Sequence, residues 1–201
     1  MDTLEAIKNR RSIRQIKSDP IDDKTLEKVL EAARWAPSWA NTQCWRFIVV
    51  TDKEVKAQLH ATRPSRPPGP PPASATPPTP PPPMAQPLID APVVIAVCAE
   101  TNKAGVRPDG TPATDKGNSW YMYDAALATQ NLCLSAHALG LGTVIIGMFD
   151  AKKADEILKI PRGFQVVVLV PLGYPAQPGR APSRKELSEI TFYNKFGASR
   201  K

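Results

Sequence analysis

The stretch AALATQNLCLSAHALGLGTVIIGMF, residues 125–149, contains no Asp, Glu, Lys or Arg. Polar side chains and glycines nevertheless interrupt its apolar character. Its glycine-free part, 125–139, would make a helix about 22 Å long, which is too short for a bilayer core of about 30 Å. We therefore predict a buried central helix, capped by Asn118 or Ser119, and after it a buried strand over 143–149.

The segments around this stretch carry both helix and strand signals. Apolar and branched residues predict three further strands, at 44–51, 91–99 and 164–172. Capping residues and helical spacing predict helices at 2–9 (with Asp2 and Glu5 as a capping box), from Asp22 or Asp23 to Pro37, at 52–61 and at 150–158. Helices and strands do not alternate strictly, which indicates the α+β class.

Proline is concentrated in one internal segment. Residues 63–87 hold 13 of the 23 prolines, which excludes helix or sheet interior there. Neither flank resembles a complete domain, so we expect one domain over residues 1–201 with a proline-rich insertion at about 63–87. A surface loop or a docking site for a proline-binding module are the two interpretations of this insertion.

Composition excludes several classes of protein. The net charge of +7 is spread without a long basic tract, which disfavours a nucleic-acid partner. Three widely spaced cysteines fit neither a disulfide framework nor a zinc site, and indicate reduced thiols in the cytoplasm. Acidic residues precede any apolar stretch at the start, so neither a signal peptide nor a membrane partner is expected.

Side-chain catalysis also finds little support. The sequence has no G-x-G-x-x-G, P-loop or G-x-S-x-G motif. Cys133 and His137 share a helix face, but two ligands do not make a metal site, so none is expected. An enzyme with this sequence needs a bound cofactor for its reactivity.

Two basic clusters are candidates for binding an anion. Arg10-Arg11-Ser12-Ile13-Arg14 follows the first predicted helix, and Ser183-Arg184-Lys185 lies near the other end of the chain. Guanidinium groups and a hydroxyl can surround a phosphate with charge-assisted hydrogen bonds. A solvated basic surface is the alternative for each cluster taken alone.

Two uncharged motifs are further candidates for binding a ligand. Residues 37–45, PSWANTQCW, place Ser, Asn and Gln side chains between two tryptophans in a helix-to-strand loop. Amides there can hydrogen-bond the edge of a flat heterocycle, or can instead satisfy the backbone of the turn. Residues 140–147, GLGTVIIG, predict a strand that ends at a glycine, where a ligand can approach the backbone closely.

The order RRSIR, PSWANTQCW, GLGTVIIG, VPLGYP and a final basic pair resembles the FMN-dependent nitroreductase family over nearly the whole chain except the insertion. The resemblance implies an α+β fold with a central, mostly antiparallel sheet flanked by helices. It also implies an intertwined homodimer with two FMN sites, each built at the subunit interface from both chains.

The resemblance assigns site residues by motif. The residues implied for the FMN phosphate and ribityl chain are Arg10, Arg11, Ser12 and Arg14, completed by Arg184 and Lys185. Those implied to reach or support the flavin from the partner subunit are Pro37, Ser38, Trp39, Asn41 and Gln43. Those implied to lie along the isoalloxazine are Val144, Ile145, Ile146 and Gly147, with a backbone N–H near Ile146 or Gly147 facing flavin N5. No side chain is assigned a catalytic role, because FMN carries the chemistry.

The implied reaction is a ping-pong exchange in which NAD(P)H reduces the flavin and a nitroaromatic, quinone or similar small molecule then accepts the electrons. Reductive dehalogenation and flavin fragmentation are alternatives within the family, and a non-catalytic FMN-binding module docked through its proline-rich segment is an alternative outside it. The sequence departs from the family at Cys44, where proline is usual, and at Met84 and Pro87, where many members carry an Asn and a Lys that contact the flavin.

Overall fold

The computed structural model describes residues 1–64 and 86–199, so most of the proline-rich insertion lies outside the described residues. The helices are α1 (Thr3–Asn9), α2 (Asp23–Arg34), α3 (Lys53–Ala61), α4 (Pro87–Asp90), α5 (Trp120–Ala138), α6 (Ala151–Ile157) and α7 (Leu187–Ile190). The strands are β1 (Trp45–Val50), β2 (Val93–Glu100), β3 (Gly142–Thr143) and β4 (Phe164–Gly173).

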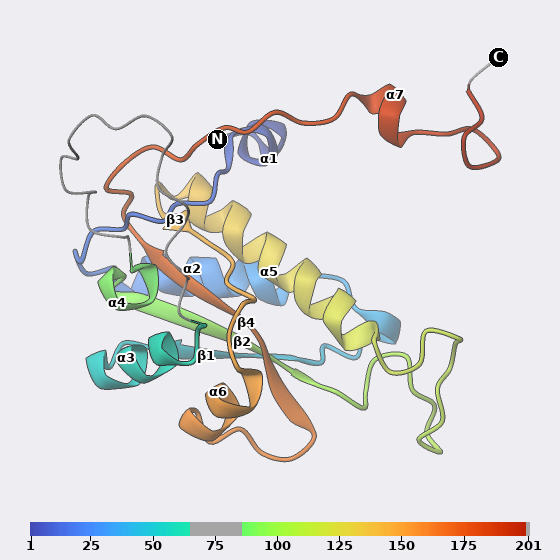
Figure 1. Cartoon of the computed structure of the whole chain (residues 1–201), viewed down its shortest axis with the longest axis horizontal. Coiled ribbons are helices and arrows are strands. Elements are labelled where there is room, and N and C mark those ends of the chain that lie inside the picture. Colours follow the sequence, from blue (N-terminus) through green and yellow to red (C-terminus); the bar gives the residue numbers. More distant parts are fainter. Residues whose placement is uncertain (65–85, 200–201) are drawn as a thin grey trace, which may run out of the picture.

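The four strands form one sheet in the order β1-β2-β4-β3, and every pairing is antiparallel. Helices α2 and α5 pack against one face, while α3, α4 and α6 cover the other (Figure 1). The predicted α+β class and the antiparallel sheet flanked by helices are therefore confirmed.

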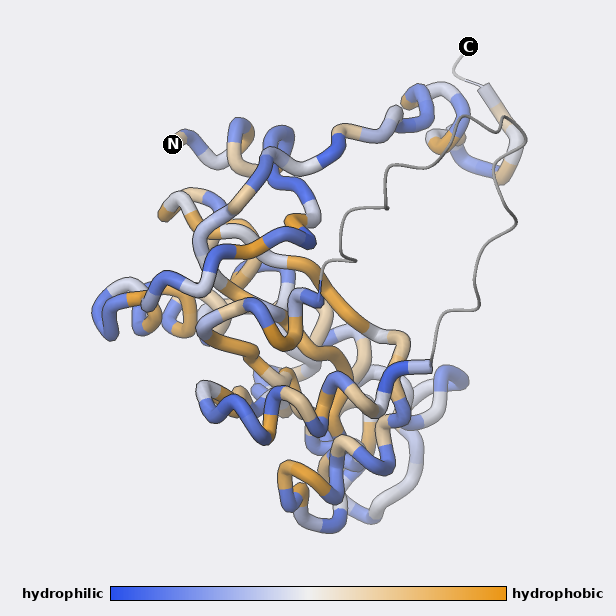
Figure 2. The backbone as a smooth tube through the Cα atoms, turned by 60° about the vertical axis from the view of Figure 1, so that its left-hand side comes forward, coloured by the Kyte–Doolittle hydropathy of each residue, from blue (hydrophilic) through white to orange (hydrophobic). Residues whose placement is uncertain are grey.

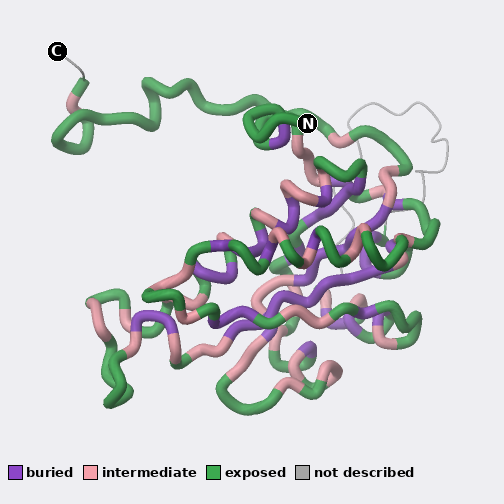
Figure 3. Tube along the Cα trace, turned by 180° about the vertical axis from the view of Figure 1, so that it is seen from behind, coloured by how far each residue is buried: buried purple, intermediate pink, exposed green. Residues whose placement is uncertain are grey.

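Strand β2 is the centre of this packing. Its alternate side chains enter two separate clusters, Ile95 and Val97 toward α2 and α5, and Val94 and Ala96 toward α3 and α6. Figure 2 shows the apolar residues gathered along the sheet, and Figure 3 shows the same segments buried. The strand predicted at 91–99 to be buried on both faces is confirmed.

The strand predicted at 143–149 is mostly wrong. Only Gly142 and Thr143 pair continuously with β4; after a two-residue interruption, Ile146 bridges Leu169 in the same register. Val144 lies opposite Pro171 in that register, and proline has no N–H to donate across the gap. The ladder therefore breaks because of a residue in the partner strand.

The predicted starts of α2, α3 and α6 are confirmed, and each is capped by an aspartate side chain. The carboxylates of Asp22, Asp52 and Asp150 accept backbone N–H groups in the first turns of α2, α3 and α6. Asp2 and Ser119 hold the N-cap positions of α1 and α5, but their side chains make no capping hydrogen bond. The predicted Asp2–Glu5 capping box is therefore wrong; Asp2 holds the start of α1 through its backbone carbonyl, which accepts from Ala6 N–H at 2.9 Å.

Two short helices were not predicted. Helix α4 begins at Pro87, a first-turn position that needs no N–H, so the insertion ends before this residue. Helix α7 lies in the C-terminal tail, where every residue from 180 to 197 is exposed. The tail runs past α1 and ends far from the sheet (Figure 1).

Residues 10–17, which we call the N-terminal strap, lie along the β3 side of the sheet. Ile13 donates its N–H to Thr143 O at 2.8 Å, and Ser12 bridges Thr143 in parallel. Farther along, Lys17 donates to Tyr174 O at 2.8 Å. The strap thus brings the first predicted motif beside the glycine-ended motif at 140–147.

Glycines make room for the strap. A Cβ on Gly142 would lie 2.8 Å from the Ile13 side chain, and one on Gly173 would lie 2.5 Å from the Ile16 side chain. Such distances are well inside van der Waals contact, so these isoleucines can seat only against a bare backbone.

The thiols are expected to be inert in the folded protein. Cys44, Cys98 and Cys133 are at most 2% exposed, and burial raises the pKa of Cys44 and of Cys98 to about 12. At pH 8 a thiol with such a pKa is thiolate in about one molecule in ten thousand, and the thiolate is the reactive form. Ellman's reagent should release almost no colour from native protein, and react with all three cysteines in guanidinium chloride. Rapid reaction of any native cysteine would contradict this burial.

Replacing Gly173 by alanine is expected to lower the free energy of unfolding by about 2 kcal/mol, because the new methyl group overpacks the site against Ile16 of the strap and against Pro92. Gly147→Ala is the matched control, since a Cβ there would meet nothing within 4 Å. Denaturant titration of both variants without cofactor measures the difference. Equal stabilities of the two would show that the strap does not pack closely on β4.

Candidate functional site

A basic hollow of about 290 Å³ opens where the strap meets the segment after β4. Ser12 and Arg14 line it from the strap, and Gln177, Gly179 and Arg180 line it from the other side. Among the residues that the structure describes, neither Arg14 nor Arg180 forms an ion pair. Two uncompensated guanidinium groups and a hydroxyl are therefore available to an anion.

The other strap arginines, Arg10 and Arg11, do not line the hollow. Arg11 donates Nη1 to the carbonyls of Lys8 and Arg10, at 2.6 and 2.8 Å, which ties the strap to the end of α1. Burial, with the nearby charges of Arg10 and Arg11, lowers the pKa of His137 in the last turn of α5. The positive charge of the strap thus extends over the C-terminal end of α5.

Arg184 and Lys185 are not part of the hollow. Both are exposed on the tail beyond it, and the chain does not bring them to Arg14. Arg180 occupies that position instead. Within one chain, the basic residue after β4 that lines the hollow lies four positions before Arg184. The assignment of Arg184 and Lys185 to a phosphate site stays a prediction.

The stretch after β3 presents alternate residues to solvent. Val144 and Ile146 are buried in the cluster on the α3 and α6 side, whereas Ile145 is 47% exposed and Gly147 is exposed. Ile146 N–H already donates to Leu169 O at 2.9 Å. Of the two N–H groups predicted to face a flavin, only that of Gly147 is without a partner within the described part of the chain.

Residues 37–44, which we call the amide loop, contain a single 3-10 turn, Trp39–Asn41. Ala40, Asn41 and Gln43 have φ values of 43°, 56° and 48°, in the left-handed region that L-residues rarely adopt. For Ala40 and Gln43 this costs about 1–2 kcal/mol each, whereas asparagine adopts the region more readily. Pro37, Asn41 and Gln43 are exposed, so the loop presents these residues outward.

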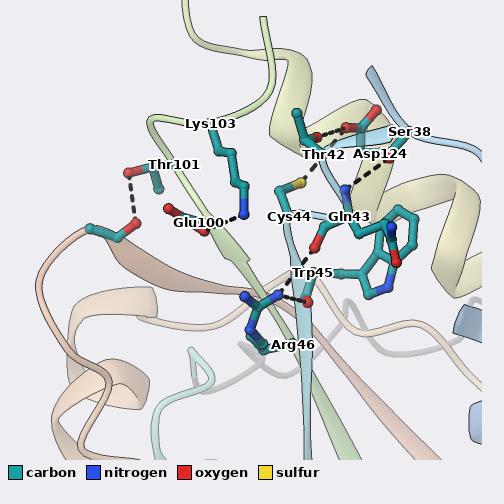
Figure 4. Close-up of polar contacts among 11 residues, drawn as sticks. Ser38, Thr42, Gln43, Cys44, Trp45, Arg46, Glu100, Thr101, Lys103 and Asp124 are labelled. Carbon is teal, nitrogen blue, oxygen red and sulfur yellow. Dashed lines mark hydrogen bonds and ion pairs between the residues drawn. The ribbon is translucent and has the colours of Figure 1, made fainter. Parts of the chain in front are cut away.

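A buried carboxylate that sequence reasoning missed lies under this loop. Asp124, 1% exposed in the first turns of α5, accepts the Trp39 N–H with both oxygens at 3.1 Å. Figure 4 shows the same carboxylate beside Thr42 and Cys44 at the end of the loop. Burial raises its pKa, and the hydrogen bond from Trp39 opposes that rise. Its position directly before the uncharged stretch at 125–149 was the available signal.

An aromatic hollow of about 330 Å³ borders the same loop. Its lining includes Trp39, Trp120, Tyr123 and Leu127. The rings of Trp39 and Trp120 are 4.8 Å apart, and those of Trp120 and Tyr123 meet edge to face at 5.8 Å. This arrangement can hold a flat, apolar molecule.

The two halves of the predicted site lie at opposite ends of α5. Asp124, under the amide loop, and His137, beside the strap arginines, are separated by about 20 Å along the helix axis. One chain therefore does not bring the amide loop to the basic hollow.

The described residues give less support for other kinds of functional site. A larger hollow of about 910 Å³ lies between α2 and β1, but none of the predicted site residues lines it. The described residues contain no group of three or more His, Cys, Asp or Glu able to hold a metal ion. None of the helices in the described part of the chain is long and apolar enough to cross a membrane.

The chain is similar to known proteins over most of its length. A family model described as "Nitroreductase family" matches residues 7–174. A Thermus thermophilus protein named NADH dehydrogenase is 29% identical over 203 residues, covering 96% of each chain. An oxygen-insensitive NADPH nitroreductase from Helicobacter pylori is 29% identical over 170 residues, 80% of each chain. An iodotyrosine deiodinase from Nematostella vectensis is 28% identical over 201 residues, 92% of this chain and 72% of that one.

Solved structures agree with the sequence relatives. Nitroreductase A from Vibrio parahaemolyticus superposes with a TM-score of 0.78 at 26% identity, covering 100% of this chain and 79% of that one. An FMN-dependent nitroreductase from Clostridium difficile superposes with a TM-score of 0.71 at 26% identity, covering 96% of this chain and 99% of that one. With the sheet, the strap and the matched family in agreement, the chain belongs to the nitroreductase family.

Proposed function

We propose that this protein is an FMN-dependent oxidoreductase that uses NAD(P)H to reduce small aromatic acceptors. The basic hollow between the strap and the segment after β4 is the main observation that supports the proposal. Arg14 and Arg180 have no acidic partner in the described chain, and Ser12 adds a hydroxyl between them. Relatives named for NADH, NADPH or FMN support the same class of cofactor.

The residues present fit FMN. A doubly charged phosphate suits the paired guanidinium groups and Ser12, while Arg10 and Arg11 add positive field behind it. Gly147 is exposed, and a Cβ added there would meet nothing within 4 Å, which leaves space for a flat ring to lie against the backbone.

The two departures from the family pattern before β2 remove contacts rather than add them. Pro87 is buried in α4, so it offers no polar group to a flavin where many members carry Lys. Met84 lies outside the described residues. The fit to FMN therefore rests on the strap, the hollow and the stretch after β3.

When bound, FMN supplies hydride transfer, taken from NAD(P)H and passed to an acceptor in a ping-pong exchange. The strap arginines bind and orient it through the phosphate. Gly147 N–H is free to donate a hydrogen bond at flavin N5, a role that the paired Ile146 N–H cannot fill. Ile145 and Gly147 then line the ring, whereas Val144 and Ile146 support this edge from the core.

We further propose a homodimer in which the amide loop of one subunit serves the flavin held by the other. The separation of loop and strap along α5 supports this arrangement. A subunit interface would also bury large apolar side chains that are exposed on α1, α5 and the tail: Leu4, Ile7, Met122, Tyr123, Leu187, Ile190 and Phe196. Arg184 and Lys185, on that tail, remain predicted contributors to a phosphate site.

The aromatic hollow favours flat acceptors such as nitroaromatics and quinones, because Trp39 and Trp120 offer ring faces and edges. Reductive dehalogenation is the second candidate, supported by the deiodinase relative. Steady-state assays with nitrofurazone and menadione against a halogenated phenol separate the two.

The purified protein is expected to be yellow, with absorbance near roughly 450 nm and one FMN per chain. Initial rates with NAD(P)H and menadione should give parallel double-reciprocal lines, because the two substrates react in turn. Protein that shows no flavin absorbance after incubation with FMN would refute the proposed function.

Arg14→Ala is expected to weaken FMN binding about tenfold to a hundredfold, the loss of one charge-assisted contact to phosphate. Riboflavin, which lacks the phosphate, should bind both proteins equally. Arg162→Ala, an exposed arginine away from the hollow, is the matched control. Fluorescence titration measures these affinities, and equal losses for FMN and riboflavin would place Arg14 away from the phosphate.

A further inference from the structure

The amide loop adopts a backbone conformation that its own sequence disfavours. Ala40, Asn41 and Gln43 all have left-handed φ values, and none of them is glycine. Inside the loop, Thr42 N–H donates to Trp39 O at 2.8 Å, and Gln43 N–H donates to Ser38 Oγ at 2.9 Å. Ser38 leaves the first N–H of the 3-10 turn uncapped, so a group outside the loop must satisfy it.

Asp124 supplies that contact. Its carboxylate accepts the Trp39 N–H with both oxygens at 3.1 Å. Oδ2 also lies 3.5 Å from Thr42 Oγ1 and 3.7 Å from Cys44 Sγ, as Figure 4 shows. The carboxylate thus touches the loop at its start and at its end. Its three partners lie 80 to 85 positions away in the sequence, so α5 fixes the loop from outside.

The side chain acts behind the loop rather than at its surface. Asp124 is 1% exposed, whereas Asn41 is exposed and Ser38 and Trp39 are half-buried. A ligand placed against the outer face of the loop meets Ser38, Trp39 and Asn41, whereas Asp124 lies beneath that face and borders the aromatic hollow.

We propose that Asp124 is a positioning residue: by holding Trp39 N–H and Thr42, it sets where the amide loop meets the flavin bound by the partner subunit. The inference rests on the proposed function, since it gives the loop a ligand. It goes further by assigning flavin affinity in one subunit to a buried carboxylate in the other.

The carboxylate is chemically specific for this role. Both of its oxygens accept from one N–H, whereas an asparagine in the same place would turn an N–H₂ group toward that donor or lose one of the two contacts. Asp124→Asn keeps the size of the side chain and removes both this complementarity and the negative charge.

Asp124→Asn is expected to bind FMN about tenfold more weakly than the wild type, the effect of losing one buried charge-assisted hydrogen bond that orders the loop. Thr129→Val is the matched control: Thr129 is buried on the same helix and donates only to Ala125 O in its own turn, at 2.7 Å. Fluorescence titration with FMN, beside thermal unfolding of the flavin-free proteins, gives both readouts. FMN affinity equal to that of the wild type would overturn the proposal.

Mixed dimers separate positioning from general destabilisation. A dimer of one Asp124→Asn subunit with one Arg14→Ala subunit retains one site with an intact strap and an intact loop, and should bind FMN there with wild-type affinity. A dimer of an Asp124→Asn/Arg14→Ala subunit with a wild-type subunit has no intact site, and should bind FMN weakly at both. The reverse pattern, with the intact site in the second dimer, would show that loop and strap act within one subunit. Identical behaviour of the two mixed dimers would show that Asp124 does not influence FMN binding. Either outcome would refute the proposal.

Should Asp124→Asn fail to fold, Thr42→Val removes one donor to the same carboxylate without leaving a buried charge unpaired. A weaker FMN affinity of this variant, by about twofold to fivefold, supports the proposal, and an unchanged affinity overturns it. Wild-type protein that binds no FMN refutes the proposed function itself, whereas normal wild-type binding with an unaffected Asp124→Asn variant refutes only the positioning role.

Discussion

The candidate site depends on the seating of the N-terminal strap against the end of the sheet. Ile13 pairs with Thr143 through the backbone, and its side chain packs where Gly142 has no Cβ. Ile16 packs in the same way on Gly173. These contacts hold Ser12 and Arg14 at the mouth of the basic hollow, so the charge of the strap has a fixed place only while two isoleucines remain buried.

The sequence predicted those parts of the fold that local pattern determines. The strand at β2, the long apolar helix α5 and the side-chain caps of α2, α3 and α6 follow from hydrophobic periodicity and capping residues. The extent of β3 could not be predicted locally, because Pro171 in another strand interrupts its ladder. The same holds for Ile146 N–H, whose partner, Leu169 O, is visible only once the register is known.

For the candidate site, the sequence predicted which motifs lie together, but not which residue of each motif makes the contact. RRSIR and GLGTVIIG do lie side by side, and the basic segment after β4 does approach the strap, but through Arg180 rather than Arg184. Asp124 was missed because a single acid beside a long apolar stretch resembles an ordinary helix start. Its importance appears only when the amide loop is seen to rest on it.

The pairing of residues near 12 with residues near 143 and 174 also bears on the order in which the molecule assembles. The strap is synthesised first, yet it cannot dock until β4 and Tyr174 have left the ribosome. Closing so long a loop costs chain entropy and yields its contacts late. The nascent chain is therefore expected to complete its sheet before the strap docks and brings Ser12 and Arg14 to the basic hollow.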